Sequence, residues 1–337
     1  MSGSRQLVEQ AVSSLAIHSP TSYSWFGQIV QLLPERVEKE MPPATARAYL
    51  HYSMQTHLYE NFYCRGGAAA MRESPLGVIR PGFTPFVQRL SASNVGNGTR
   101  EPGWRVRGTE NRTVIVERHG LSLWLSHEDT WPRVRRRVPP RETTVSVRFP
   151  KELLQLSPGF YMALGDRWLD AENGHDVLRF YWHLRSDGAN ALVAAATVRL
   201  NRARLPFRLK VVSEPERYLR CDAGVLYARK RDYALLASVV RAVYADVSSQ
   251  LEPTTPVFAK RLAPGLGLAE DPGHGDSFGM HRCGLLAEGI IRAHEQSRDS
   301  VTERFKAVEQ YFEETGISLS APFLNPGSKD RYGFPVD

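Results

Sequence analysis

The chain has 337 residues, of which 42% are hydrophobic and 10% aromatic, and this composition predicts a globular protein with a substantial buried core. The formal net charge of +7 indicates an anionic partner, such as a phosphorylated substrate, an acidic peptide or nucleic acid, as the alternative to a merely solvated basic surface. Three widely spaced cysteines and the lack of any long apolar run argue against a disulfide framework, a structural zinc site, a secretion signal and a membrane-spanning helix, so we expect a cytoplasmic protein.

Residues 1–95 are predicted to form a helical N-terminal region. Apolar side chains recur at helical spacing between Leu7 and Ile17, and again between Trp25 and Leu33. Residues 45–64 carry aromatic side chains at the same spacing, and the glycines that follow are typical of a helix C-terminus. We expect this aromatic stripe to be part of the core.

Residues 96–150 are predicted to form a β-rich connecting region. The expected strands are residues 104–107, 113–118, 121–125 and 144–149. His119 and Gly120 can form the tight turn of a hairpin. The basic, proline-punctuated segment 131–141 (WPRVRRRVPPR) is expected to be an exposed loop, with a peptide-docking surface as the alternative.

Residues 151–320 are predicted to form an α+β domain, and residues 321–337 an irregular tail. The expected strands are residues 160–164, 177–184, 206–212, 224–228 and 256–260, and the expected helices are residues 189–202, 233–247, 281–294 and 300–315. Residues 264–278 are rich in glycine but lack the GK[ST] ending of a nucleotide-binding loop, so we expect a lid or a structural turn there. The whole chain therefore predicts an α+β fold, in which a helical N-terminal part precedes a mixed or antiparallel sheet flanked by helices.

Cations cluster between residues 205 and 283 at strand-and-turn spacing. They are Arg208, Lys210, Arg217, Arg220, Lys230, Arg231, Lys260, Arg261 and Arg282. A planar guanidinium can bind two phosphate oxygens at once, so such a cluster suits a phosphorylated substrate. No metal-ligand spacing, phosphate-binding glycine loop or nucleophile elbow accompanies it, and the sequence indicates neither a metal nor a cofactor.

Five segments in this part of the chain resemble the HopA-type effector domain. In order they read RFYWHL, LPFRLKV, YLRCDAGVLYARKRDY, FAKRLAPGLGLAEDP and SFGMHRC, and the resemblance is clear from about residue 160 to residue 294. A looser likeness extends to YLHYSMQTHLYENFYCRGG in the N-terminal region. The family takes its name from a bacterial type III secreted effector, and its domain also occurs as a stand-alone lyase of class V lanthipeptide and thioamidated peptide biosynthesis.

The resemblance implies a lyase that works after a separate kinase-like protein. The kinase would phosphorylate Ser or Thr of a ribosomal precursor peptide, and the HopA-like protein would eliminate phosphate to leave dehydroalanine or dehydrobutyrine. The family is also functionally similar to the OspF-type phosphothreonine lyases, which have a base lysine, an acid histidine and phosphate-binding arginines. No cofactor is implied.

Lys210 is the candidate general base for such an elimination. Arg208 and Lys210 lie two residues apart in an expected strand, so both point to one face while Phe207 and Leu209 point to the other. Lysine can lose its proton where other cations crowd it, whereas arginine cannot. The alternative is a pair of solvent-facing charges on an edge strand.

The remaining candidates follow from the same chemistry. His183 alternates with Arg179 and Tyr181 on one strand and is the first candidate acid, with His281 as its rival and His274 third. Tyr227 is expected to hydrogen-bond the substrate backbone, and Asp222 to orient a cation. The candidate phosphate ligands are Arg179, Arg208, Arg217, Arg220, Lys260 and Arg282.

Two other functional classes remain open at this point. One is a type III effector-like module that binds phosphopeptide or protein without catalysis. The other is a nucleic-acid binder, which is disfavoured because no known module or aromatic platform accompanies the charge. The helical periodicity of the first 18 residues favours the stand-alone enzyme, for which we expect neither a nucleic-acid nor a membrane partner.

Overall fold

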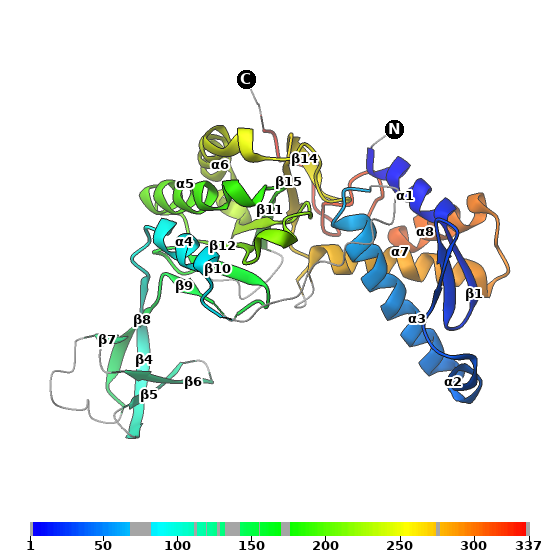
Figure 1. Cartoon of the computed structure of the whole chain (residues 1–337). Helices are drawn as coiled ribbons and strands as arrows, with labels where there is room; N and C mark the ends of the chain where they lie inside the picture. The colour runs from blue at the N-terminus through cyan, green and yellow to red at the C-terminus, as the bar shows by residue number, and fades with distance from the viewer. Residues whose placement is uncertain are drawn as a thin grey trace.

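The structure is a computed structural model that describes residues 3–67, 82–110, 113–118, 120–126, 129–131, 142–154, 156–169, 176–273 and 277–334. Across these residues the chain forms eight α-helices and three antiparallel sheets, which confirms the predicted α+β class. Figure 1 shows a helical body, a central sheet and an outlying sheet along the length of the molecule. No helix in these ranges is long and apolar enough to cross a bilayer.

The N-terminal region is only partly helical. Its elements are α1 (Gly3–Ser14), β1 (Leu15–Ser19), β2 (Ser22–Trp25), β3 (Gln28–Gln31), α2 (Glu35–Glu40), α3 (Pro43–Leu58) and a π-helix η1 (Tyr59–Tyr63). The helical prediction is therefore wrong from residue 15 to residue 31, because a three-stranded sheet of order β1-β2-β3 forms there. Phe26 and Gly27 both have positive φ (48° and 78°), which gives the tight turn that a hairpin requires.

The predicted β-rich region forms a separate sheet, which we call the β-arm (residues 99–149). Its strands are β4 (Thr99–Glu110), β5 (Thr113–Arg118), β6 (Leu121–Ser126), β7 (Thr130–Trp131) and β8 (Thr144–Phe149), in the order β6-β5-β4-β8-β7. The arm has its own small apolar cluster around Trp104 and projects from the main body (Figure 1). The expected strands are confirmed, whereas His119 and most of the basic segment 131–141 lie outside the described residues.

A seven-stranded antiparallel sheet forms the centre of the molecule. Its strands are β9 (Glu152–Leu153), β10 (Phe160–Leu164), β11 (Val177–Trp182), β12 (Phe207–Val212), β13 (Gly224–Arg229), β14 (Lys260–Ala263) and β15 (Leu266–Glu270), in the order β14-β15-β11-β13-β12-β10-β9. The predicted strand 256–260 starts only at Lys260, and the predicted loop 264–278 contains β15. Gly265 has φ 73° and allows the turn between β14 and β15, so this glycine joins two paired strands and is not part of a lid.

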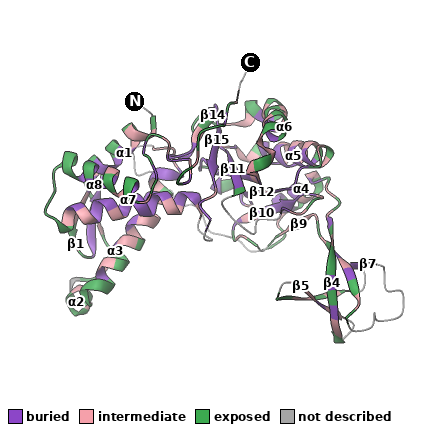
Figure 2. Cartoon of the chain, turned by 180° about the vertical axis from the view of Figure 1, so that it is seen from behind, coloured by how far each residue is buried: buried purple, intermediate pink, exposed green. Residues whose placement is uncertain are grey.

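Helices pack around this sheet and against the N-terminal region. The remaining α-helices are α4 (Pro85–Ser93), α5 (Ala189–Arg202), α6 (Tyr233–Val247), α7 (Phe278–Glu295) and α8 (Val301–Glu314). Short 3-10 helices occupy Ser186–Gly188, Pro215–Arg217, Lys230–Asp232 and Ser248–Gln250. Figure 2 shows buried residues along the central strands and along α7, which is the helix that α3 and α8 both contact.

Residues 321–334, the described part of the C-terminal tail, form no helix or strand, as predicted, but their polar groups are bound to the sheet. Glu270 is fully buried and accepts hydrogen bonds from the Asn325 backbone (2.8 Å) and the Tyr332 hydroxyl (2.5 Å), and it pairs with Lys230 at 2.5 Å. Lys260 pairs with Asp330 at 2.6 Å. The tail is therefore an integral part of the folded body.

The crossing of α7 and α8 is tight enough to exclude a methyl group. A Cβ on Gly289 would lie 2.6 Å from the Cα of Val308, which cannot move without its helix. We expect Gly289→Ala to lower the free energy of unfolding by about 1–3 kcal/mol in urea titrations, as overpacked cores do. The control is Gly284→Ala on the same helix, where the added Cβ would meet only the movable end of Gln55. Equal losses in the two variants would contradict the close-crossing explanation.

His57 links the stability of the N-terminal region to pH. Its ring lies 5.5 Å from the rings of Tyr23 and Trp25, and burial lowers its pKa from 6.5 to about 4. The unfolded chain therefore binds a proton that the folded chain refuses, so this contribution to stability is complete above pH 6.5 and is lost as the pH falls towards 4. We expect the difference in unfolding free energy between pH 7 and pH 4.5 to be smaller in His57→Phe, which keeps a ring. An unchanged pH dependence in this variant would show that other groups carry it.

Candidate functional site

The two faces of the central sheet differ in character. Gly224 pairs with Trp182, and a Cβ on Gly224 would lie 2.9 Å from Leu192 of α5, so this face is covered by α5. On the other face, Arg179 pairs with Tyr227, which in turn pairs with Arg208. Because directly paired residues of an antiparallel sheet point the same way, these three side chains share one face. We call it the cationic face.

Lys210 lies on the cationic face between two aromatic rings. Its Nζ is 4.5 Å from the centre of the Phe160 ring and 5.8 Å from the centre of the Tyr227 ring. The guanidinium of Arg179 lies 5.2 Å from the same Tyr227 ring. Lys210 and Tyr227 are half-buried, so a ligand can reach both. The fold thus brings together the candidate base, the candidate tyrosine and one candidate phosphate ligand.

Arg220 approaches Lys210 from the turn before β13. Its guanidinium lies 5.4 Å from the centre of the Phe160 ring, the ring that Lys210 also contacts. Asp222 holds it in two places, with Nε to Oδ1 at 2.5 Å and Nη2 to Oδ2 at 2.9 Å. A forked pair of this kind fixes the plane of the guanidinium. The prediction that Asp222 orients a cation is confirmed.

Tyr59 completes this group from the N-terminal region. Its hydroxyl accepts a hydrogen bond from Arg220 Nη2 (2.9 Å) and donates one to Asp222 Oδ2 (3.2 Å). We call Tyr59, Arg220 and Asp222 the buried triad. The sequence analysis missed Tyr59, because an aromatic residue in an aromatic stripe reads as core. Tyr59 begins η1, and π-helical turns are frequent at functional sites, but no sequence spacing indicated one here.

The charges of the buried triad are set by their mutual contacts. Burial raises the pKa of Asp222, but the charge and hydrogen bonds of Arg220 and the nearby charge of Lys210 outweigh it, so the pKa of Asp222 is lowered. Burial also raises the pKa of Tyr59 well above its usual value, so its phenol keeps its proton. Asp222 therefore remains an anion that neutralises part of the charge around Lys210.

Arg179 and Arg208, the two arginines that define the cationic face, each donate a hydrogen bond to a neighbouring group. Arg179 donates from Nε to Asp271 Oδ2 at 2.7 Å, and both side chains are largely buried. Arg208 donates from Nη2 to the carbonyl of Leu169 (3.0 Å), and its guanidinium lies 5.3 Å from the Trp168 ring. Arg208 is half-buried and so more open to solvent than Arg179. Asp271 was also missed, because residues 264–278 were expected to form a loop apart from the sheet.

His183 follows β11, and its ring is bound by a neighbouring loop. Its Nδ1 lies 2.7 Å from the hydroxyl and 3.2 Å from the carbonyl oxygen of Thr254. Burial lowers the pKa of His183, with smaller opposing effects from the Thr254 backbone and from Glu252 and Asp222. The His183 ring is therefore neutral at pH 7 and lacks the proton that an imidazolium would donate, which disfavours the acid role predicted for His183.

Arg282 binds the tail, and His281 contacts Arg282. Arg282 is fully buried and donates to the carbonyls of Pro322 (2.7 Å) and Leu324 (2.9 Å), and burial lowers its pKa to about 10. The Nη1 of Arg282 lies 2.8 Å from Nδ1 of His281. We therefore assign Arg282 to tail attachment and leave it out of the site.

The remaining candidates lie elsewhere or outside the described residues. Lys260 pairs with Leu268, which pairs with Phe180, so it lies on the helix-covered side of the sheet, four strands from Lys210. Arg217 is buried in its own turn with Glu214 at 3.6 Å. His274 is outside the described residues. Lys260 therefore lies apart from the cationic face, and Arg217 is engaged by a carboxylate of its own turn.

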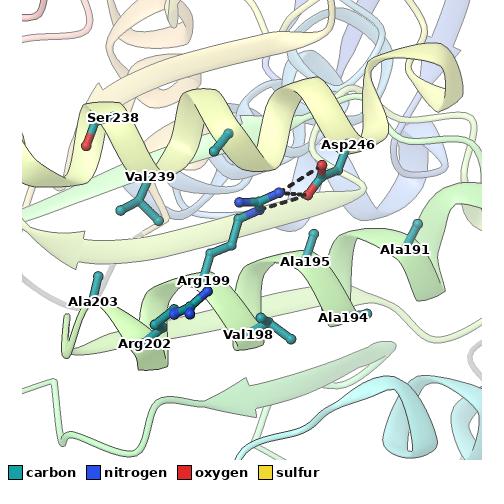
Figure 3. A pocket seen from close by; sticks show the side chains of 11 residues that line it. Ala191, Ala194, Ala195, Val198, Arg199, Arg202, Ala203, Ser238, Val239 and Asp246 are labelled. Carbon is teal, nitrogen blue, oxygen red and sulfur yellow. Dashed lines mark hydrogen bonds and ion pairs between the residues drawn. The ribbon is translucent and has the colours of Figure 1, made fainter.

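A hollow of about 730 Å³ lies on the outer side of α5 and α6 (Figure 3). Small side chains of α5 line it, and an ion pair between Arg199 and Asp246 crosses it. It belongs to the helix-covered side of the sheet, opposite the cationic face. Within the parts of the chain that the structure describes, no group of three or more His, Cys, Asp or Glu could hold a metal ion.

Comparison with known proteins identifies the family of this chain. The model of the HopA1 effector protein family matches residues 153–324, which include the cationic face and part of the tail. Two solved effector structures are similar, one from Pseudomonas syringae pv. tomato strain DC3000 (16% identity, 82% of this chain and 98% of that chain, TM-score 0.43) and one from Pseudomonas syringae pv. syringae strain 61 (14% identity, 82% and 96%, TM-score 0.42). No curated protein matches the chain. Since the family model covers half of the residues, the chain belongs to the HopA1 effector protein family.

Proposed function

We propose that this effector-family protein is a lyase that eliminates phosphate from phosphoserine or phosphothreonine of a peptide, leaving dehydroalanine or dehydrobutyrine. The observation that carries the proposal is the position of Lys210. It is a half-buried amine on one face of a sheet, between two aromatic rings and among Arg179, Arg208 and Arg220. A base beside several phosphate-binding groups is what this elimination needs.

The reaction balances with the groups present. The Nζ of Lys210 takes the α-proton of the phosphorylated residue, and the electrons of that C–H bond form the Cα=Cβ double bond. The Cβ–O bond breaks, and its electron pair leaves with the phosphate. The proton on Lys210 then returns to solvent, so neither oxidant nor reductant is required.

In this proposal the arginines stabilise the leaving phosphate, and Tyr227 stabilises the negative charge that develops next to the Cα. Arg208 and Arg220 stabilise the phosphate as it leaves, since its charge rises while the Cβ–O bond breaks. Tyr227 is close enough to Lys210 to donate a hydrogen bond to the carbonyl next to the Cα, where carbanion character develops. Because His183 is neutral, the phosphate leaves as an anion that guanidinium groups stabilise, and histidine does not protonate it.

The alternative is a phosphopeptide-binding module without catalysis. Two arginines of the cationic face are already paired with buried carboxylates, Arg179 with Asp271 and Arg220 with Asp222. Such pairs fix the orientation of the guanidinium groups, which is useful both for binding and for catalysis. Only a measurement of turnover therefore distinguishes the two functions. In the lyase proposal, a separate kinase-like protein in the cytoplasm supplies the phosphorylated peptide.

The test is mass spectrometry of a synthetic phosphothreonine peptide incubated with the purified full chain. We expect each processed residue to lose the mass of one phosphoric acid. A thiol reagent added afterwards should then react with the double bond of the new dehydro residue. The activity should persist in EDTA and without added nucleotide, because the proposed site uses only side chains of the chain. Binding of the phosphopeptide without any mass change would support the binding module and contradict the lyase. A product with the mass of the unphosphorylated threonine peptide would instead indicate hydrolysis of the phosphate by a phosphatase.

A further inference from the structure

The N-terminal region binds the turn that carries Arg220. Residues 59–65 follow α3, and residues 219–222 lead into β13. The backbone N–H of Cys221 donates a hydrogen bond to the carbonyl of Cys64 at 2.7 Å. The two segments are far apart in the chain, so this contact is made only when the N-terminal region packs on the central sheet.

Two further contacts show how closely the two segments fit. Nη1 of Arg65 donates to the carbonyl of Leu219 at 3.3 Å. Gly66 has φ 69°, and a Cβ at this position would lie 3.2 Å from the Sγ of Cys221. The N-terminal region therefore holds the backbone of the turn along its length.

Side chains of the same segment hold the guanidinium of Arg220. Its Nε and Nη2 donate to Asp222, and Nη2 also donates to the hydroxyl of Tyr59 at 2.9 Å and to the Sγ of Cys64 at 3.4 Å. The Tyr59 ring stacks on the Tyr63 ring, with 5.4 Å between the ring centres and 16° between the planes. This stacking fixes the ring of Tyr59, and with it the position of the hydroxyl that Arg220 binds.

One nitrogen of Arg220 is left for a ligand. Among the described residues Nη1 donates to no acceptor, although only 3% of Arg220 is exposed. Buried donors are nearly always paired, because an unpaired one costs free energy. The guanidinium lies 5.4 Å from the centre of the Phe160 ring, and Nζ of Lys210 lies 4.5 Å from the same centre. An anion beside Lys210 is therefore within reach of Nη1.

We propose that Tyr59 is a positioning residue of the phosphate site, and that it orients Arg220 so that Nη1 binds a phosphate oxygen of the substrate. The phenol acts through Arg220 and not by contact with the substrate. Residues 59–65 then belong to the site, although the family model begins at residue 153. The proposal rests on the proposed function in one respect, that the anion bound beside Lys210 is a phosphate group.

The test measures phosphate binding without elimination. The probe is a fluorescein-labelled peptide with the phosphonate analogue of phosphothreonine, in which CH2 replaces the ester oxygen, so that no phosphate can leave. Its affinity for the full chain is measured by fluorescence anisotropy, with the unmodified threonine peptide as the reference. Tyr59→Phe should weaken phosphonate binding about tenfold, the effect of losing one hydrogen bond to a charged group, and should leave binding of the threonine peptide unchanged.

Tyr63→Phe provides the matched control. Tyr63 lies in the same π-helix, is fully buried and stacks on Tyr59, but its hydroxyl is not among the acceptors of Arg220. Its phosphonate affinity should equal that of the wild type, and urea titrations of both variants report any loss of stability separately. Equal weakening in the two variants, or undiminished binding in Tyr59→Phe, would overturn the proposal.

A double-mutant cycle tests whether Tyr59 acts through Arg220. Arg220→Lys keeps the positive charge but has no planar guanidinium to orient. Adding Tyr59→Phe to Arg220→Lys should change phosphonate affinity less than about twofold, whereas independent effects would multiply. A further tenfold loss in the double variant would contradict action through Arg220. If Arg220→Lys does not fold, the comparison of Tyr59→Phe with Tyr63→Phe decides by itself.

Activity separates this proposal from the lyase proposal. With both correct, Tyr59→Phe should raise KM and lower kcat for a phosphothreonine peptide, because Arg220 binds phosphate in the ground state and in the transition state. If phosphonate binding depends on Tyr59 while no phosphothreonine peptide loses phosphate, the lyase proposal fails and the positioning role stands. If elimination occurs and Tyr59→Phe has the KM and kcat of the wild type, the positioning role fails alone.

Discussion

Lys210→Ala is expected to leave a folded protein that still binds phosphopeptide but eliminates phosphate at least about 10²–10⁴-fold more slowly, the range that a positioned general base contributes. The physical reason is that the amine removes the α-proton only in the transition state, whereas the arginines hold phosphate in both states. The loss should therefore appear in kcat and hardly in KM. The measurement is the time course of phosphate loss by mass spectrometry, with binding followed by calorimetry.

Two companion variants make the Lys210 result specific. Lys210→Arg keeps the positive charge but cannot act as a base, so it should be as inactive as Lys210→Ala while binding phosphopeptide more tightly. Lys306→Ala removes an exposed lysine of α8 and should behave as the wild type. Full activity in Lys210→Arg would show that Lys210 contributes only charge, and another residue would have to be the base.

Asp222→Ala is expected to cause the largest loss of stability, about 3–5 kcal/mol, because it leaves the guanidinium of Arg220 buried without its partner. Both side chains are almost inaccessible, and two short hydrogen bonds join them. The measurement is the urea midpoint and slope of unfolding at neutral pH. Removing both charges in Asp222→Ala with Arg220→Met should restore part of the loss, since no uncompensated charge then remains.

The exposed ion pair between Arg199 and Asp246 is the matched control for Asp222. Both side chains are about 40% exposed, and the pair lies at 2.7 Å on the outer side of α5 and α6. Asp246→Ala should cost about 0–1 kcal/mol, because water screens the charges. Comparable losses in Asp222→Ala and Asp246→Ala would contradict the argument from burial.

Part of the site was predictable because strands impose a period of two. The alternation in LPFRLKV places Arg208 and Lys210 on one face and apolar residues on the other, and the register of β12 with β13 agrees with it. The same periodicity predicted Arg179 and Tyr181 on one side of β11. Tyr227 and Arg220 were candidates from residue type alone, and the fold brings both to the same face.

The fold places other candidates away from Lys210, because residue type says nothing about which face, edge or partner a side chain meets. Lys260 and Arg282 are cations in motifs like those around Lys210, yet one faces the helix-covered side and the other binds carbonyls of the tail. Both partners of Arg282 lie about 40 residues further along the chain. A local sequence pattern contains no information about contacts between residues so far apart in the chain.

The sequence by itself determined the α+β class, most strands of the central sheet, α5, α6 and the placement of Arg208 and Lys210 on one side of their strand, because apolar periodicity encodes which side of an element is buried. Only the tertiary structure decided that residues 15–31 pair as a sheet, that β15 fills the supposed glycine loop and that Tyr59 reaches Arg220 and Asp222. These outcomes depend on segments far apart in the chain. Burial of a polar group is tolerated only when a partner is present, and the fold, not the local sequence, supplies that partner.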